Sequence, residues 1–308
     1  MRYNDKGSKV MTVQRVLLDR GYKLPRFGAD GHLGDETWDA LQQYAGDNGL
    51  QWDPEAPSRV INSLISTQSR PTMPAPPGSP SMEVSNIRLI DLRDEQPDPP
   101  PPVRGKMKMK IGTDGKVLKR APSAIDTIVI HQTATPFSAT RQAKEAHPDD
   151  PHRALAERAK GVACHVMAFK EGFLAWPNPL DWYVYHGNGW NATELGLEID
   201  GNYPGVKGGK TWNGKKPTEV TPDVIRSACA AIELMVIKGR QMGMPIEYIH
   251  AHRQSSDTRR DDPGEELWRN VVLGYAVPIL GLKVEQGRTI GKGRPVPKEW
   301  DPNGVGRY

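Results

Sequence analysis

The sequence predicts an α/β domain preceded by a small all-α domain of three helices. Three observations lead to this fold class. Before residue 68, apolar residues recur at helical spacing. Between residues 69 and 104, proline runs indicate an extended linker. From residue 105 onward, strand patterns alternate with helix patterns, and this alternation is typical of α/β folds.

The all-α domain is expected over residues 1–68. Its first helix is marked by apolar residues at helical spacing, namely Val10, Val13, Leu17 and Leu18. Ser8 is a plausible N-cap and Gly21 a plausible stop for this helix. A glycine-rich loop follows, and Asp35 opens a second helix that closes near Gly46. A third helix is expected over residues 58–64.

The linker, residues 69–104, carries the proline runs PTMPAPPGSP and QPDPPPPV. Between these runs, NIRLIDLRD alternates like a short strand that could form the edge of the next domain. The α/β domain is expected over residues 105–282. The last stretch, residues 283–308, is basic, rich in glycine and proline, and without periodicity. We interpret it as a tail or a surface wrap.

The elements expected in the α/β domain are, in order, a hairpin around Thr-Asp-Gly at 113–115, a strand over 125–131, a helix through about 139–160, two strands around 170–172, a strand over 194–200, a helix opened by Thr221 and Pro222, a strand over 248–250 and a helix from 265. The strand over 125–131 is apolar and ends on His131. The helix through 139–160 is interrupted by the pair His147-Pro148.

Composition excludes several classes of protein. Hydrophobic residues make up 37% and charged residues 25% of 308, which suits a globular protein with a core. Two cysteines are too few for a disulfide scaffold or a cysteine-rich zinc site. No apolar run is long enough to span a membrane, and MRYNDKGSKVMTVQ lacks the features of a signal peptide. The net charge of +4 suits an anionic polymer, although it carries little weight alone.

Three residues form a plausible ligand set for a metal: His131, His252 and Asp262. Two imidazoles and one carboxylate are a common zinc set, and they leave the fourth position for water. Bound zinc lowers the pKa of that water to about 7 and polarises a carbonyl. Any one of these histidines alone would more often be structural. The residues by themselves therefore indicate a metal-assisted hydrolase that acts on an anionic polymer.

The runs IDTIVIHQTAT, ELGLEIDG and HAHRQSSDTRRDDPGEELW closely resemble the zinc amidase family. That family includes N-acetylmuramoyl-L-alanine amidases, phage lysins and peptidoglycan recognition proteins, and the resemblance spans about residues 124–275. It implies a mixed central sheet flanked by helices, Zn²⁺ on His131, His252 and Asp262, and peptidoglycan as the partner. The implied bond is the amide between N-acetylmuramic acid and L-alanine. Neither nucleic acid nor membrane insertion is expected.

The resemblance also implies the catalytic roles. Glu198 is the expected general base, with an exposed strand residue as the alternative. Some phage members instead place a tyrosine just before the histidine that corresponds to His165, where this chain has Cys164. Arg260 stands where many members have the lysine that stabilises the oxyanion, and a guanidinium can donate to that charge. The neighbouring Arg259 is expected to be a surface charge or to contact the substrate.

Further expectations concern residues around the cleft. His186 matches a family position beside the cleft and is a candidate for substrate binding, with a structural role as the alternative. Trp190 and Asn191 could line a groove for sugar and peptide, although core packing is the default for tryptophan. His250 would point the same way as His252 on a strand, so it competes as a ligand. We prefer His252 because its spacing to Asp262 fits the family.

The run GSKVMTVQRVLLDRGYKLPRFGADGHLGDETWDALQQYAGDNGL resembles the three-helix peptidoglycan-binding module of many cell-wall hydrolases. An unrelated small helical domain is the alternative. Such a module without a signal peptide suggests a phage endolysin, monomeric and held in the host cytoplasm until lysis. A bacterial autolysin, a secreted wall-degrading toxin and a non-catalytic peptidoglycan receptor are the other settings.

Overall fold

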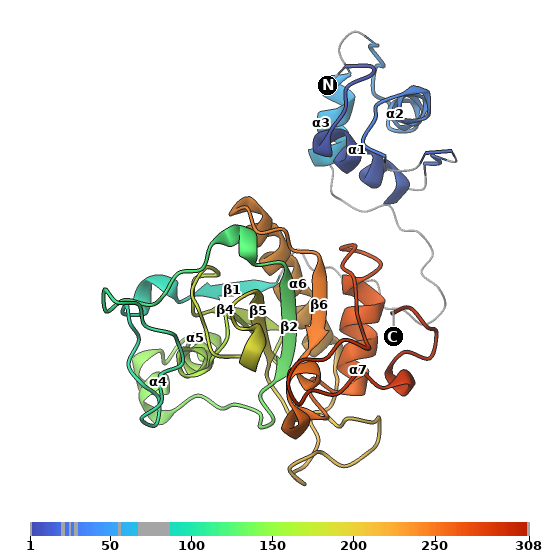
Figure 1. Ribbon diagram of the computed structural model, residues 1–308. Coiled ribbons are helices and arrows are strands. Elements are labelled where there is room, and N and C mark those ends of the chain that lie inside the picture. The colour runs from blue at the N-terminus through green and yellow to red at the C-terminus, as the bar shows by residue number, and fades with distance from the viewer. Residues whose placement is uncertain are drawn as a thin grey trace. The chain divides into compact units, whose positions relative to one another are not determined.

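The computed structural model describes residues 2–19, 22–24, 26–27, 30–54, 57–66 and 87–306. The chain divides into two compact units, Met1–Ser81 and Met82–Tyr308 (Figure 1). Gly21, expected to stop the first helix, and the first half of the expected linker, residues 69–86, lie outside the described residues. None of the described helices is long and apolar enough to cross a membrane.

The first unit holds three helices among its described residues: α1 (Ser8–Asp19), α2 (Asp35–Asp47) and α3 (Ser58–Ser66). Val10, Val13 and Leu17 are buried in its core, whereas Leu18 is 38% exposed. The side chain of Gln14 on α1 donates to Asp30, at 2.8 Å, and to the Thr37 hydroxyl, at 2.9 Å. It also accepts from the backbone of Gly31 at 2.7 Å. One buried amide therefore fixes the glycine-rich loop against the first two helices.

The second unit is built on a six-stranded mixed sheet in the order β1-β4-β3-β5-β2-β6 (Figure 1). The strands are β1 (Arg88–Asp91), β2 (Thr127–Gln132), β3 (Val166–Phe169), β4 (Phe173–Trp176), β5 (Glu194–Ile199) and β6 (Tyr248–Ala251). Every neighbouring pair is parallel except β3 and β4, which form an antiparallel hairpin. The strand expected inside the linker is β1, and it forms one edge of the sheet.

Helices cover both faces of the sheet. Alternate residues of β3 separate the two faces: Val166 and Ala168 join the core beneath α6 (Pro222–Gln241), whereas Met167 packs with α5 (Pro151–Ala156). The Thr221 hydroxyl caps α6 by accepting from the backbone of Val224 at 3.3 Å, as its sequence predicts.

Two expected elements differ in detail. The helix predicted through 139–160 is divided into α4 (Arg141–Ala146) and α5, because the chain turns at His147-Pro148, and a 3-10 turn follows α5. The final helix begins as α7 (Glu265–Leu267) and continues as a π-helix over Trp268–Ala276. The expected hairpin is present, with Ile111 bridged to Val117.

The stretch beyond residue 282 packs onto the second unit. Trp300 is fully buried, Val296 is 1% exposed, and both belong to the core that includes α6. The side chain of Gln286 donates to the buried carboxylate of Asp301 at 2.6 Å. Of the two interpretations of this stretch, a wrap describes it better than a tail, because its apolar side chains complete the core.

Candidate functional site

The three expected metal ligands lie together at one end of the sheet. Ligand atoms of His131, His252 and Asp262 all lie within 4.8 Å of one another. His131 is near the carboxyl end of β2, and His252 directly follows β6. Since β2 and β6 are parallel neighbours, their carboxyl ends meet at the same edge, where open α/β sheets commonly bind ligands.

Asp262 reaches this edge from the turn after β6. Its Oδ1 accepts from the backbone N–H of Gln132 at 2.8 Å, and its Oδ2 lies 2.9 Å from Nδ1 of His252. The backbone N–H of Arg253 donates to the carbonyl of Asp262 at 3.2 Å. The carboxylate is thus held by the backbone of β2 and by the ring of His252.

Gln132, which the sequence analysis did not single out, clamps the same turn. Its side-chain N–H groups donate to the carbonyls of Tyr203, Asp261 and Pro263 at 2.8, 3.0 and 3.2 Å. Its Oε1 accepts from the backbone of Tyr203 at 2.6 Å. The only sequence signal for this role is its position directly after His131.

The protonation pattern around His131 fits a metal ligand. Nε2 of His186 lies 3.2 Å from the carbonyl of Glu194 and must donate to it, which leaves Nδ1 of His186 as an acceptor. Nε2 of His131, 3.2 Å away, then donates to that nitrogen. Nδ1 of His131 is left buried, with a lone pair and no hydrogen-bond partner. Burial, followed by the charge of His252, lowers the pKa of His131 well below its usual range, so the imidazole is neutral.

This donor set fits Zn²⁺. A neutral imidazole, a second imidazole and a buried carboxylate provide the two nitrogens and one oxygen of an open catalytic site. The unpartnered Nδ1 of His131 is the observation that decides the fit, because a buried polar atom without a partner is rare unless a ligand completes it. The hydrogen bond from His131 to His186 is the type of contact that orients a metal-binding imidazole.

His186 is held by its neighbours rather than displayed to solvent. Its backbone N–H and that of Gly187 donate to the side-chain oxygen of Asn191 at 2.9 and 2.6 Å. Its ring lies against Gly196, where a Cβ atom would come within 2.6 Å of the imidazole. The glycine in ELGLEID therefore leaves the space that the ring of His186 occupies.

Trp190 and Asn191 are each 5% exposed. The ring of Trp190 packs on that of His250, with 4.8 Å between centroids. Asn191 thus holds the backbone of His186, and Trp190 packs on His250. A direct contact of either residue with substrate stays a prediction.

His250 lies outside the ligand group. It is 1% exposed, and its Nδ1 lies 3.0 Å from Oε1 of Glu194, a carboxyl whose pKa burial raises to about 9. The expectation that His250 and His252 share a face assumed a continuous strand. That assumption is wrong, because β6 ends at Ala251 and a 3-10 turn begins at His252. Of the two alternatives, the geometry favours His252.

Glu198 lies beside His131, its register partner between β2 and β5. The residue is half-buried, and its Oε2 is buried without a hydrogen-bond partner. Burial, followed by the negative charge of Asp262, raises the pKa of Glu198 to about 8, while the charges of Arg259 and Lys108 oppose the rise. A bound cation beside Asp262 would oppose it further. The carboxylate can therefore exchange a proton near neutral pH.

The cations whose charges act on Glu198 are Arg259 and Lys108, whereas the sequence analysis expected Arg260 at the site. The charge of Arg259 lowers the pKa of both Glu198 and His131, and its guanidinium lies 5.6 Å from the ring centroid of Trp212. Lys108 is half-buried, and its carbonyl accepts from the backbone of Tyr185 at 2.7 Å. Arg260 is exposed. Its oxyanion role stays a prediction, and the sequence analysis missed Lys108.

Cys164 is fully buried, and burial raises the pKa of its thiol well above the usual range. It packs in the core with Met167 and Phe169. Its side chain is therefore part of the packing under the site.

The C-terminal segment supports the turn that carries His252. Gln254 is fully buried, and its Nε2 donates to the carbonyls of Glu285 and Arg288 at 2.8 and 2.7 Å. Its Oε1 accepts from the backbone of Ala251 at 2.9 Å. The backbone N–H of Arg294 donates to the carbonyl of Arg253 at 2.8 Å.

We expect Gln254→Ala to weaken zinc affinity by about tenfold to a hundredfold, the usual effect of losing a contact that supports a ligand. The variant leaves the carbonyls of Glu285 and Arg288 without these partners and frees the residues next to His252. Competition with a chromogenic chelator measures the dissociation constant. Gln241→Ala, on the exposed end of α6, is the matched control. Unchanged affinity in folded Gln254→Ala protein would show that the segment does not position His252.

Comparison with known proteins agrees with this geometry. Residues 121–265 match the family model described as N-acetylmuramoyl-L-alanine amidase. These residues form an amidase domain of that family. All three ligand residues, as well as Glu198 and His186, lie inside the matched segment. No curated protein matches the chain in sequence.

Solved structures with a similar chain path include the endolysin N-acetylmuramoyl-L-alanine amidase LysCS from Clostridium intestinale, at 17% identity and a TM-score of 0.35, covering 61% of this chain and 96% of that one. Bumblebee PGRP-SA has 16% identity and a TM-score of 0.37, with 60% and 96% covered. Drosophila PGRP-LB has 15% identity and a TM-score of 0.37, with 64% and 96% covered. The family assignment rests on the match over residues 121–265.

Proposed function

We propose that the chain is a zinc-dependent N-acetylmuramoyl-L-alanine amidase that hydrolyses the amide between N-acetylmuramic acid and the L-alanine of the stem peptide. The observation that carries this proposal is the group formed by His131, His252 and Asp262, whose ligand atoms lie within 4.8 Å inside the matched segment. Nδ1 of His131, buried and unpartnered, supports a metal at this place.

Zinc, when bound, supplies a Lewis acid that polarises the amide carbonyl and lowers the pKa of water to about 7. The remaining work falls to side chains. Glu198, beside His131 across two paired strands, takes the proton of the attacking water and returns it to the leaving nitrogen. His186 keeps the donating nitrogen of His131 turned away from the reacting groups. Asp262 is oriented by the backbone of Gln132.

For the oxyanion of the tetrahedral intermediate, Arg260 is the proposed donor because of its place two residues before Asp262. Arg259 is a second candidate, since its charge acts on Glu198 and His131. A guanidinium stays protonated at any pH of interest, so either residue can stabilise the charge without supplying the proton.

The first unit is proposed to bind peptidoglycan. The resemblance to wall-binding modules includes four residues that form one hydrogen-bonded cluster. They are Gln14, Asp30, Gly31 and Thr37. A binding unit tethered to an amidase domain raises the local enzyme concentration on an insoluble wall. Release from a host cell at phage-induced lysis is the setting we propose, with an autolysin or a delivered toxin as alternatives.

Mass spectrometry of digested wall tests the function. We expect new stem peptides that begin with a free L-alanine amine, together with glycan strands whose muramic acid has lost its peptide. Chelator treatment should abolish their release, and added Zn²⁺ should restore it. Cuts within the peptide, with the muramic acid amide intact, would contradict the assignment in favour of a peptidase. Wall binding without any release would indicate a non-catalytic receptor.

A further inference from the structure

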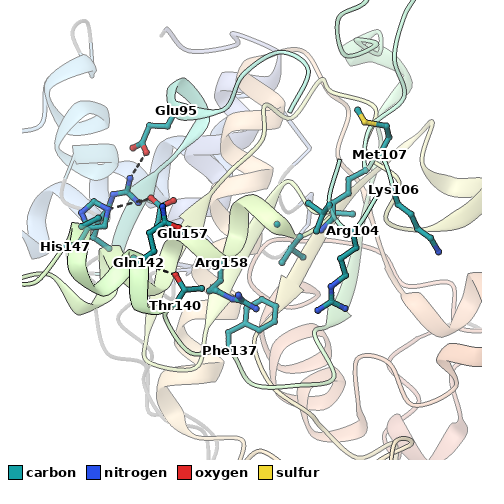
Figure 2. Close-up of a pocket in the computed structure, with 18 of the residues that line it drawn as sticks. Glu95, Arg104, Lys106, Met107, Phe137, Thr140, Gln142, His147, Glu157 and Arg158 are labelled. Atoms are coloured by element: carbon teal, nitrogen blue, oxygen red, sulfur yellow. Dashed lines mark hydrogen bonds and ion pairs between the residues drawn. The ribbon is translucent and has the colours of Figure 1, made fainter. Parts of the chain in front are cut away.

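A second hollow lies on the amidase-containing unit, apart from the His131, His252 and Asp262 group. Its volume is about 1070 Å³. One wall is the segment from Val103 to Lys108, and the opposite wall is formed by α4, α5 and the turn after α5 (Figure 2). Tyr185 also lines it. None of the three proposed metal ligands lines it.

The charges of this cavity do not balance. Its lining includes two carboxylates, Glu95 and Glu157, and both already form ion pairs with Arg153 and Lys160. The other lining cations are Arg104, Lys106, Lys108 and Arg158. Within the described part of the chain, none of these four has a carboxylate at ion-pair distance. Among the described residues, the cavity therefore gathers four cations that form no ion pair.

Among the described residues, Arg158 forms no ion pair or hydrogen bond through its side chain. It is half-buried, and its guanidinium carbon lies 5.0 Å from the ring centroid of Phe137. Its Nε is buried and makes no hydrogen bond. Figure 2 shows Arg104 on the wall facing Phe137 and Arg158. Two guanidinium groups on facing walls suit the bidentate recognition of carboxylates.

Lys108 joins this cavity to the catalytic site. Its side chain lines the cavity, and its charge acts on Glu198, the proposed general base. Tyr185 lines the cavity as well, and the next residue, His186, contacts His131. Two lining residues, Lys108 and Tyr185, thus lie next to residues of the proposed catalytic group, and we take the substrate to extend from that group into the cavity.

We propose that this cavity is a carboxylate-binding subsite, in which Arg104, Lys108 and Arg158 hold the free carboxylates of the peptide portion of the substrate. The inference rests on the proposed function, because the peptide must extend from the amide that is cleaved. Arg104 and Lys108 lie before residue 121, outside the segment that matches the family. Arg158 lies inside that segment, so the subsite combines residues from within and outside it. It makes the enzyme selective for acidic peptides over amidated ones.

The test compares two soluble muramyl peptides, one with free carboxylates and one with the same carboxylates amidated, on the full chain. We expect the wild type to have a KM at least about tenfold lower for the acidic peptide, because a charge-assisted pair is lost on amidation. Arg158→Gln and Arg104→Gln should raise KM for the acidic peptide by about the same factor, with little change in kcat. Their KM for the amidated peptide should stay unchanged.

Lys110→Gln is the matched control, since Lys110 is exposed and does not line the cavity. Arg158→Lys, which keeps the charge but not the fork, should recover part of the selectivity. Thermal unfolding of each variant shows whether it is folded. Equal KM for the two peptides in the wild type, or equal effects of Arg158→Gln on both, would overturn the subsite.

Binding to the zinc-free protein separates this inference from the proposed function. Calorimetry with the acidic peptide should show binding that Arg158→Gln weakens, whether or not any amide is cleaved. Cleavage without charge selectivity would retain the amidase and reject the subsite. Stronger competition by a phosphate polymer than by the acidic peptide would reject the peptide as its occupant.

Discussion

Asp262→Ala is expected to lose both bound zinc and amide hydrolysis. The carboxylate is one of three donors within 4.8 Å, and it is buried, with its Oδ1 fixed by the backbone of Gln132. Removing it leaves two imidazoles, too few for the open site that catalytic zinc requires. Because the proposed zinc would supply both the activated water and the polarised carbonyl, we expect hydrolysis to fall by at least about 10³-fold.

Two measurements on one sample check this prediction: zinc per protein chain and the rate of release of peptides with a free L-alanine amine. Asp262→Asn keeps the shape of the side chain and can still accept from the backbone of Gln132, so it guards against a folding defect. Asp257→Ala is the matched control, because Asp257 lies in the same turn and outside the ligand group. Full hydrolysis by a zinc-free Asp262 variant would end the zinc mechanism.

The proximity of the three proposed ligands, His131, His252 and Asp262, could be predicted because its signals are local. An apolar strand that ends near His131 and a short, distinctive run from His252 to Asp262 are both visible in the sequence. Two parallel strands then bring their carboxyl ends together without any further information. The predicted helix boundary at Thr221 was also local, since a cap and a first-turn proline define it.

The surroundings of the group could not be predicted in the same way. Whether His250 and His252 face the same way depends on where β6 stops, and a period-two pattern cannot show that a strand ends between two histidines. The contacts of Gln254 with Glu285 and Arg288 join residues more than thirty positions apart. Such contacts leave no periodicity in the sequence, which is why the stretch beyond residue 282 looked like a tail.

The positions of the charged residues around Glu198 could not be predicted from the sequence either. Spacing assigns the oxyanion to Arg260, whereas the three-dimensional charge distribution brings Arg259 and Lys108 to bear on Glu198. Lys108 reaches this place because an isolated bridge between Met109 and Val184 joins its segment to the one that carries Tyr185, far along the chain. Backbone pairing between distant segments and the turn after His252 decide which cation faces the site. Neither feature can be read from the spacing of the cations in the sequence.

Glu198→Gln is expected to keep zinc and lose turnover. The change preserves side-chain volume and touches none of the three ligands, so metal content should match that of the wild type. A general base contributes about 10²–10⁴-fold to rate, and kcat should fall by that amount. If Glu198 were only a half-exposed strand residue, its replacement would change stability by less than about 0.5 kcal/mol and leave turnover nearly unchanged.

The size of the effect therefore distinguishes the two roles of Glu198. Steady-state kinetics on a soluble muramyl peptide, with zinc content measured in parallel, gives kcat at known metal occupancy. Glu219→Gln, in the exposed stretch before α6, controls for the loss of one negative charge. A loss of kcat with zinc retained assigns the proton transfer to Glu198, because neither metal loss nor unfolding accounts for it. A kcat within about twofold of the wild type would show that Glu198 is not the general base. Its replacement would then behave like that of an ordinary surface residue.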